Sequence, residues 1–223
     1  MAYVPLALPD SLTDSVRMAI EIGVEPPLQD VHWMLATRVG ISTEAGPPRQ
    51  LGLPIALVLL TTVAGVSELL LHTDKIRDAD KFKECLIRYF PWHIARPIGV
   101  PREGAANILY QHFRCPLVHG LGFHKRNEPI FRTVQPFPGS DNAEKDIEEL
   151  ERLTEEPISE HCLLVTPEKR VLHLHQFYWG VRKMVERWSH DDTQVLRADK
   201  KLAACVVEGG SNRHGAKKDT NSV

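Results

Sequence analysis

The sequence predicts a mainly α-helical domain with one small β-hairpin before the C-terminal helix. Three observations lead to this fold class. Residues 51–67 form a run without any charge, several other segments carry apolar residues at helical spacing, and two short β-like runs, 162–165 and 171–177, flank the turn-like segment TPEKR. Long uncharged and amphipathic helices with a single hairpin are typical of a helical bundle.

Apolar side chains recur every three or four positions in most of the predicted helices, which places them on one face. In the uncharged segment, Pro54 suits a first helical turn, and no basic cluster or aromatic belt flanks the run. A membrane span needs about 20 apolar residues, so we expect a helix buried in the core and no membrane partner. The predicted helices cover residues 11–23, 28–38, 54–71, 78–91 and 102–115, and one more follows the hairpin as far as Trp188.

The predicted domain covers residues 1–206, with the hairpin at about 162–177. Residues 207–223 are polar and rich in Gly, Lys and Asn, so we expect a disordered tail. No internal repeat divides the chain, and we therefore expect a single domain.

Composition narrows the class of protein. Apolar residues make up 43% of the chain and the formal net charge is −2, which excludes a strongly basic nucleic-acid-binding chain. The four cysteines include no Cys-x-x-Cys pair, and the N-terminus has no basic segment followed by a long apolar run. We expect free thiols and a cytoplasmic location.

Charge is nevertheless unevenly distributed. Residues 73–132 hold eleven Lys/Arg against six Asp/Glu, whereas residues 141–160 hold nine Asp/Glu against two Lys/Arg. The basic stretch suits a phosphate-bearing ligand, although solvation of a helix face explains it equally well.

The segment FRCPLVHG, residues 113–120, sets Arg114 and His119 five positions apart in an apolar context. On an ideal helix such residues point about 140° away from each other. Pro116 lacks an N–H and disfavours the helical conformation at Cys115, so we expect a kink or break between them. A distorted turn would bring the guanidinium and the imidazole towards one pocket.

This segment, preceded by ILYQHF, resembles the signature of the HEPN family, an Arg and a His separated by four to six residues. The resemblance covers roughly residues 50–125 and extends more loosely to the hairpin and the helix after it. It implies a HEPN-like helical bundle that forms a homodimer, and a metal-independent endoribonuclease without a cofactor. It also implies a role in a toxin–antitoxin or defence system, with RNA as the substrate and an antitoxin or other protein as a further partner.

In the site that the resemblance implies, Arg114 and His119 are catalytic. Arginine binds phosphate through a rigid fork of donors, and histidine exchanges protons near neutral pH, as RNA cleavage through the 2′-hydroxyl requires. Tyr110, His112 and Cys115 lie close enough in sequence to contact the substrate. Active HEPN members often carry a polar residue where this chain has Cys115, and a proline within the motif is unusual.

These two departures keep a non-catalytic HEPN-like module, binding nucleotides or proteins, as an alternative. A third reading is a zinc site. His112, Cys115, His119 and His124 have a spacing that permits metal ligation, and Cys85 or His93 could join them. His173 and His175 alternate in a predicted strand and would share one face, which again permits a metal.

Overall fold

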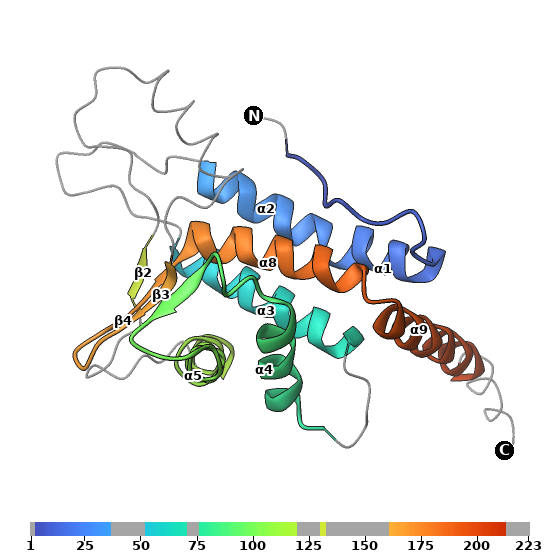
Figure 1. Cartoon of the computed structure of the whole chain (residues 1–223). Coiled ribbons are helices and arrows are strands. Elements are labelled where there is room, and N and C mark those ends of the chain that lie inside the picture. Colours follow the sequence, from blue (N-terminus) through green and yellow to red (C-terminus); the bar gives the residue numbers. More distant parts are fainter. Residues whose placement is uncertain (1–2, 37–51, 71–75, 120–129, 133–160, 213–223) are drawn as a thin grey trace, which may run out of the picture.

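The computed structural model describes residues 3–36, 52–70, 76–119, 130–132 and 161–212. Within these residues the protein is mainly helical with a small sheet, as the sequence predicted (Figure 1). Buried side chains from the helices and the sheet form one hydrophobic core. The helices are α1 (Asp14–Gly23), α2 (Glu25–Ala36), α3 (Gly52–Leu70), α4 (Asp78–Tyr89), α5 (Arg102–Ile108), the π-helix η1 (Leu109–Arg114), α6 (Cys115–His119), α8 (Leu174–Ser189) and α9 (Asp192–Asn212).

The uncharged segment forms α3, which packs against α2, α4 and α8 in the middle of the molecule (Figure 1). Ile55, Leu59, Leu60 and Val63 have no exposed surface. By length and composition alone this helix could cross a membrane, but half of its most apolar window is buried inside the protein. The packing agrees with the predicted core helix, and the cytoplasmic location stays a prediction.

Helices α1 and α2 follow each other with only Val24 between them. Pro26 and Pro27 lie in the first turn of α2, where a missing N–H removes no helical hydrogen bond. The Glu25 carboxylate accepts hydrogen bonds from the Tyr3 hydroxyl and the Leu6 N–H, which holds the N-terminal segment against this junction.

The predicted hairpin is present as β3 (His161–Val165) and β4 (Arg170–His173), paired antiparallel with Leu163 opposite Leu172. Two strands of three residues each extend it on both edges in parallel orientation. They are β1 (Arg96–Ile98), beside β3, and β2 (Ile130–Arg132), beside β4. The sequence did not predict either of them, since a three-residue strand carries too few positions for a readable alternation.

The predicted end of the hairpin at residue 177 is wrong, because β4 ends at His173 and α8 begins at Leu174. From that residue on, apolar side chains at helical spacing are buried against the core, and Tyr178 and Trp179 are buried as well. The spaced positions are Leu174, Phe177, Val181, Met184, Val185 and Trp188.

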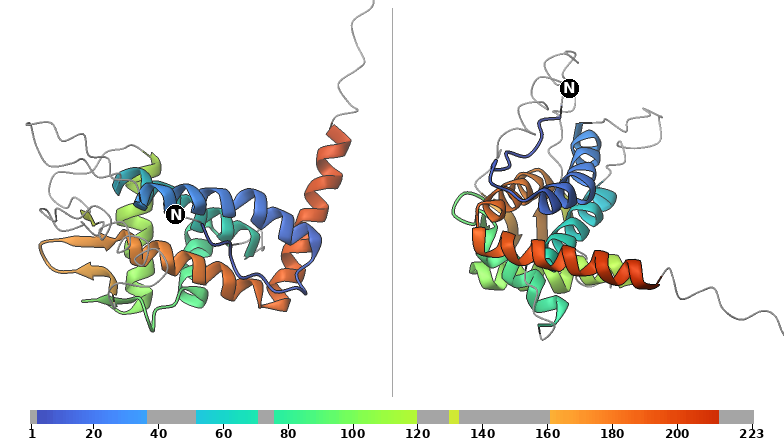
Figure 2. Two further views of the ribbon diagram at one scale, coloured as in Figure 1. Left: turned by 90° about the horizontal axis from the view of Figure 1, so that it is seen from above. Right: turned by 90° about the vertical axis from the view of Figure 1, so that its right-hand side faces the viewer.

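Helix α9 follows α8 and contacts α1, α3 and α8. Its C-terminal part projects beyond the other elements (Figure 2). The polar tail was predicted from residue 207, but the helix continues to Asn212. Leu202, Ala203 and Ala204 are good helix formers shortly before the predicted boundary, and the helix extends past it. Residues 213–223 lie outside the described part of the chain.

Candidate functional site

The helix that carries the motif is continuous from Arg102 to His119, passing from α5 through the π-helix η1 into α6. The predicted break at Pro116 is therefore wrong, and Cys115 keeps a helical conformation with φ −60° and ψ −47°. The Cys115 N–H donates to the Tyr110 carbonyl, five residues back. This wider turn inserts an extra residue immediately before the proline, which lets the helix accommodate Pro116 without breaking.

Arg114 lies against two aromatic rings. Its guanidinium carbon is 5.2 Å from the Tyr110 ring centroid and 5.7 Å from that of Phe82, on α4. These two rings are themselves 5.5 Å apart and tilted by 58°. Aromatic faces attract a cation without neutralising it.

The same guanidinium has no acidic partner among the described residues, where neither an ion pair nor a hydrogen bond to it is found. Its Nε is buried without a hydrogen-bond partner. A buried donor in this state is costly unless something else binds it. Among the described residues, Arg114 thus combines a charge without an acidic partner and a buried Nε without a hydrogen bond, and both features suit an anion.

Tyr110 and Cys115 lie on the Arg114 side of the helix. Burial raises the pKa of the Tyr110 hydroxyl, and the neighbouring Cys115 thiol raises this pKa further. Tyr110 was predicted to contact a substrate. In the structure the face of its ring packs against the Arg114 guanidinium. Cys115 is half-buried beside it.

His112 lies elsewhere. Two positions separate it from Arg114, which places it on nearly the opposite side of the helix in either the α or the π geometry. Burial lowers the pKa of His112, and the cationic Arg170 of β4 lowers it further. The structure therefore brings Arg114, Tyr110 and Cys115 together and separates His112 from them.

His119 is the last residue of α6, and its side chain lies outside the described residues. The break that was expected to bring the two residues together is absent, because the helix continues through Pro116.

Phe82 is the site residue that sequence reasoning missed. It lies on the apolar stripe of α4 together with Cys85, Leu86 and Tyr89, and all four are buried. Nothing in the local pattern indicates which of them faces a residue 32 positions further along the chain.

The zinc reading gains no support from the described residues, which contain no group of three or more His, Cys, Asp or Glu side chains suited to a metal. Cys85 is buried with its Sγ 3.7 Å from the Met184 Sδ, and the exposed His93 contacts Arg187. His124 lies outside the described residues.

The predicted shared face of His173 and His175 is wrong. The strand ends at His173, and His175 is buried in the first turn of α8. The His173 ring instead meets the His161 ring edge to face, at 4.8 Å between centroids.

No protein-family model, curated protein or solved structure matches this chain. The relation to HEPN domains therefore stays a prediction that rests on the motif and the helical context.

Proposed function

We propose that this protein is a HEPN-like, metal-independent endoribonuclease in which Arg114 binds the scissile phosphate and His119 transfers protons. The observation that carries the proposal is the environment of Arg114, whose charge is held by two rings and met by no acidic group within the described residues. An arginine placed in this way is available to a phosphate.

The proposed reaction is internal transesterification. The 2′-hydroxyl loses its proton and its oxygen attacks the adjacent phosphorus, while the bond from phosphorus to the 5′-oxygen breaks. The leaving 5′-oxygen takes up a proton, and a 2′,3′-cyclic phosphate remains. His119 would supply or accept a proton, and Arg114 would stabilise the charge that grows on the phosphoryl oxygens.

Two further parts of the proposal follow from the resemblance. A homodimer would bring a second Arg114 and a second His119 to the site. A toxin or defence role, with an antitoxin or other protein as neutralising partner, would be consistent with an RNA-cleaving activity that needs no cofactor.

One observation favours a second candidate, a nucleotide- or protein-binding module without catalysis. The helix runs unbroken through Pro116, so no break in the helix brings Arg114 and His119 together. In this case Arg114 would bind a phosphate, and no proton transfer would follow.

The test is to incubate the purified protein with mixed RNA, with and without EDTA, and to analyse the ends of the products. We expect cleavage that persists in EDTA and leaves 2′,3′-cyclic phosphates. Arg114→Ala should lower the rate by about 100- to 1,000-fold, since it removes charge stabilisation. His119→Ala should lower it by about 100- to 10,000-fold, since it removes proton transfer.

The matched controls are Arg77→Ala and His93→Ala, at exposed positions away from the motif, which should retain full activity. Arg114→Lys keeps the charge but not the fork of donors, so an intermediate rate is expected. RNA binding without cleavage, weakened in Arg114→Ala and unchanged in His119→Ala, would support the binding module instead.

A further inference from the structure

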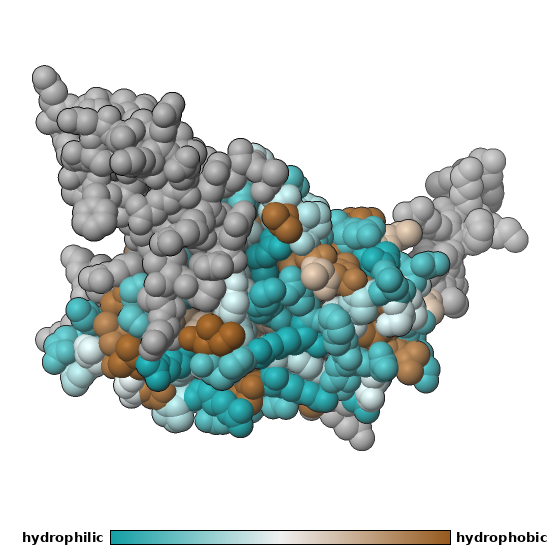
Figure 3. All heavy atoms as spheres, turned by 45° about the horizontal axis from the view of Figure 1, so that its top comes forward, coloured by the Kyte–Doolittle hydropathy of each residue, from teal (hydrophilic) through white to brown (hydrophobic). Residues whose placement is uncertain are grey.

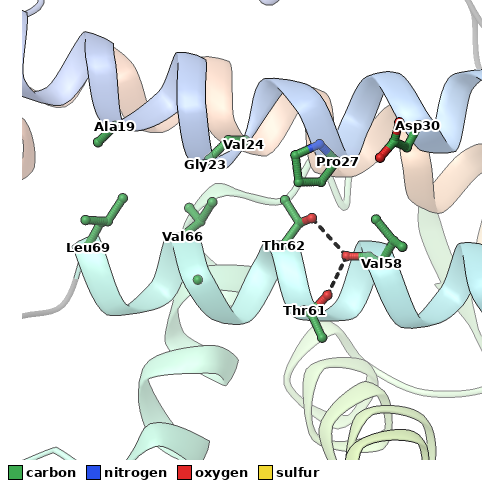
Figure 4. A pocket seen from close by; sticks show the side chains of 11 residues that line it. Ala19, Gly23, Val24, Pro27, Asp30, Val58, Thr61, Thr62, Val66 and Leu69 are labelled. Carbon is green, nitrogen blue, oxygen red and sulfur yellow. Dashed lines mark hydrogen bonds between the residues drawn. The ribbon is translucent and has the colours of Figure 1, made fainter.

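A groove of about 430 Å³ lies between α3 and the consecutive helices α1 and α2 (Figure 4). Thr61 and Thr62 line it, and both hydroxyls donate to carbonyls of their own helix, at Leu57 and Val58. Gly65 adds no side chain to its wall. On the face shown in Figure 3, apolar side chains form separate patches in a mainly hydrophilic surface. The unused cationic donors of the described residues lie elsewhere, beside the helix that carries the motif.

Among the arginines that the structure describes, two have a buried Nε without a hydrogen-bond partner. One is Arg114, and the other is Arg170, the first residue of β4. Neither an ion pair nor a hydrogen bond to the Arg170 guanidinium is found within the described part of the chain. By comparison, Arg88 donates to Asp191, and Arg182 donates to two backbone carbonyls. A buried cationic donor without a partner costs free energy unless a ligand binds it.

Arg170 lies near His112 of η1, since the helix that contains η1 runs beside the hairpin (Figures 1 and 2). Both side chains are half-buried. Burial lowers the pKa of His112, and the Arg170 charge lowers it further. The acid closest to Arg170 in sequence, Glu168, accepts a hydrogen bond from the Thr166 hydroxyl instead. An anion bound between the guanidinium and the imidazole would relieve their unfavourable interaction.

The chemistry of the pair favours a phosphate of a nucleic-acid strand. Arginine binds phosphate through a planar fork of donors, and a phosphate oxygen can also accept the ring N–H of His112. His112 and Arg114 lie on nearly opposite sides of η1, so donors for anions flank this helix on both sides. A nucleic-acid strand carries phosphates at regular intervals and can contact more than one of these donors.

We propose that Arg170, with His112 beside it, binds a phosphate of the RNA strand other than the one at Arg114. The inference rests on the proposed function for the kind of strand that is bound, but it does not require that the strand is cleaved. It assigns Arg170 and His112 to substrate binding, outside the catalytic pair, and it gives the hairpin a part in holding the RNA.

The probe is a short fluorescein-labelled 2′-O-methyl oligouridylate, which is not cleaved because a methyl group blocks the attacking oxygen. Its anisotropy is measured with the full chain at several NaCl concentrations. Each phosphate contact on a single strand contributes about 0.7 to the slope of log affinity against log salt concentration. Arg170→Met should therefore weaken binding by about tenfold and reduce this slope by about 0.7.

Three further variants show whether the contact is specific. Arg170→Lys keeps the charge without the planar fork, so it should keep the slope and weaken binding less than Arg170→Met does. Lys169→Met removes one positive charge at the exposed neighbouring position and should leave the affinity and the slope unchanged. His112→Gln should weaken binding by about threefold, because it removes one hydrogen bond to the phosphate.

The stability of the free protein gives a second readout. Because Arg170 has no partner among the described residues, Arg170→Met should keep or raise the free energy of unfolding in urea. A loss of stability together with unchanged affinity for the oligonucleotide would make Arg170 a structural residue and would overturn the proposal.

Cleavage of ordinary RNA, measured beside binding, separates this inference from the proposed function. Binding that depends on Arg170 without any cleavage would support the phosphate site and count against the ribonuclease. Cleavage by the wild type, with unchanged oligonucleotide affinity and slope in Arg170→Met, would support the ribonuclease and overturn the phosphate site. An absence of oligonucleotide binding, or equal weakening in Lys169→Met, would also overturn it. Binding of polyglutamate that depends on Arg170, in place of the oligonucleotide, would replace the RNA by an acidic protein.

Discussion

His175 shows how burial alters a single residue. It lies in the first turn of α8, where β4 ends, with 2% of its surface exposed. Burial lowers the pKa of His175 to about 4, and the neighbouring His173 contributes to the lower pKa. A neutral imidazole is therefore the form that the folded protein retains.

We predict that His175 makes the protein less stable in mild acid. Its pKa is near 6.5 in the unfolded chain and about 4 in the folded one, so between these values the unfolded chain binds more protons. The free energy of unfolding should then fall as the pH drops from about 6.5 to 4, by up to about 3 kcal/mol from this residue. Urea unfolding at several pH values measures this change in the free energy of unfolding.

The variant His175→Gln should flatten that pH dependence even if it lowers stability at pH 7. His93→Gln, at an exposed position, serves as the control and should keep the wild-type slope. An unchanged slope in His175→Gln would assign the acid sensitivity to other groups.

At the scale of the elements, two helical glycines have opposite surroundings. Gly65 in α3 faces open space, whereas a Cβ on Gly180 in α8 would lie 2.2 Å from the Cζ of Phe90. Gly180 thus permits the close packing of α8 on Phe90, and Gly65 only keeps the groove open.

We predict opposite effects of alanine at these positions. Gly65→Ala should stabilise the protein by about 0.5–1 kcal/mol, because alanine favours the helix and meets no neighbour. Gly180→Ala should destabilise it by about 1–3 kcal/mol, because the methyl group overlaps the Phe90 ring. Denaturant midpoints of the two variants, measured side by side, check both values, and equal shifts would contradict the close packing at Gly180.

At the scale of the whole molecule, Asp191 joins three helices at the corner between α8 and α9. Its carboxylate accepts hydrogen bonds from the Arg88 Nη2 and the Tyr89 hydroxyl of α4, at 2.9 and 2.8 Å. It also accepts the Gln194 N–H, at 3.3 Å, in the first turn of α9. Burial and the hydrogen bond to Asp191 raise the pKa of Tyr89 above its usual range.

We predict that Asp191→Ala costs about 2–3 kcal/mol of stability, because it removes a helix cap and leaves the Tyr89 hydroxyl without its acceptor. Tyr89→Phe should cost about 1 kcal/mol, since it deletes the other member of that hydrogen bond. Asp192→Ala, at the exposed neighbouring position, should change stability by less than about 1 kcal/mol. Thermal unfolding of the three variants separates these outcomes. Equal losses of stability in Asp191→Ala and Asp192→Ala would contradict the proposed contribution of the Asp191 hydrogen bonds.

Sequence reasoning located most of the helices, because their signals are local, but it did not predict α9. The apolar spacing of residues 78–89 and the uncharged run of α3 are each readable within one segment, and the structure places both helices as expected. Boundaries were less accurate. The start of α8 was assigned to the hairpin, since His173, Leu174 and His175 also alternate as a strand would.

The candidate site was predictable only in part. The spacing of the motif identified Arg114. Tyr110 and Cys115 were chosen because they are close to Arg114 in sequence. The π turn and the contact with Phe82 were not predictable, because no local rule relates a residue of α4 to one 32 positions later.

The sequence by itself determined the helical class, the central apolar helix, the hairpin and the position of the Arg114 segment, because periodicity and turn residues act over a few positions. Only the tertiary structure decided that the helix continues through Pro116, that His112 is separated from Arg114, and that two aromatic rings hold the guanidinium. These features depend on which distant segments pack together, and that packing is the outcome of the whole core.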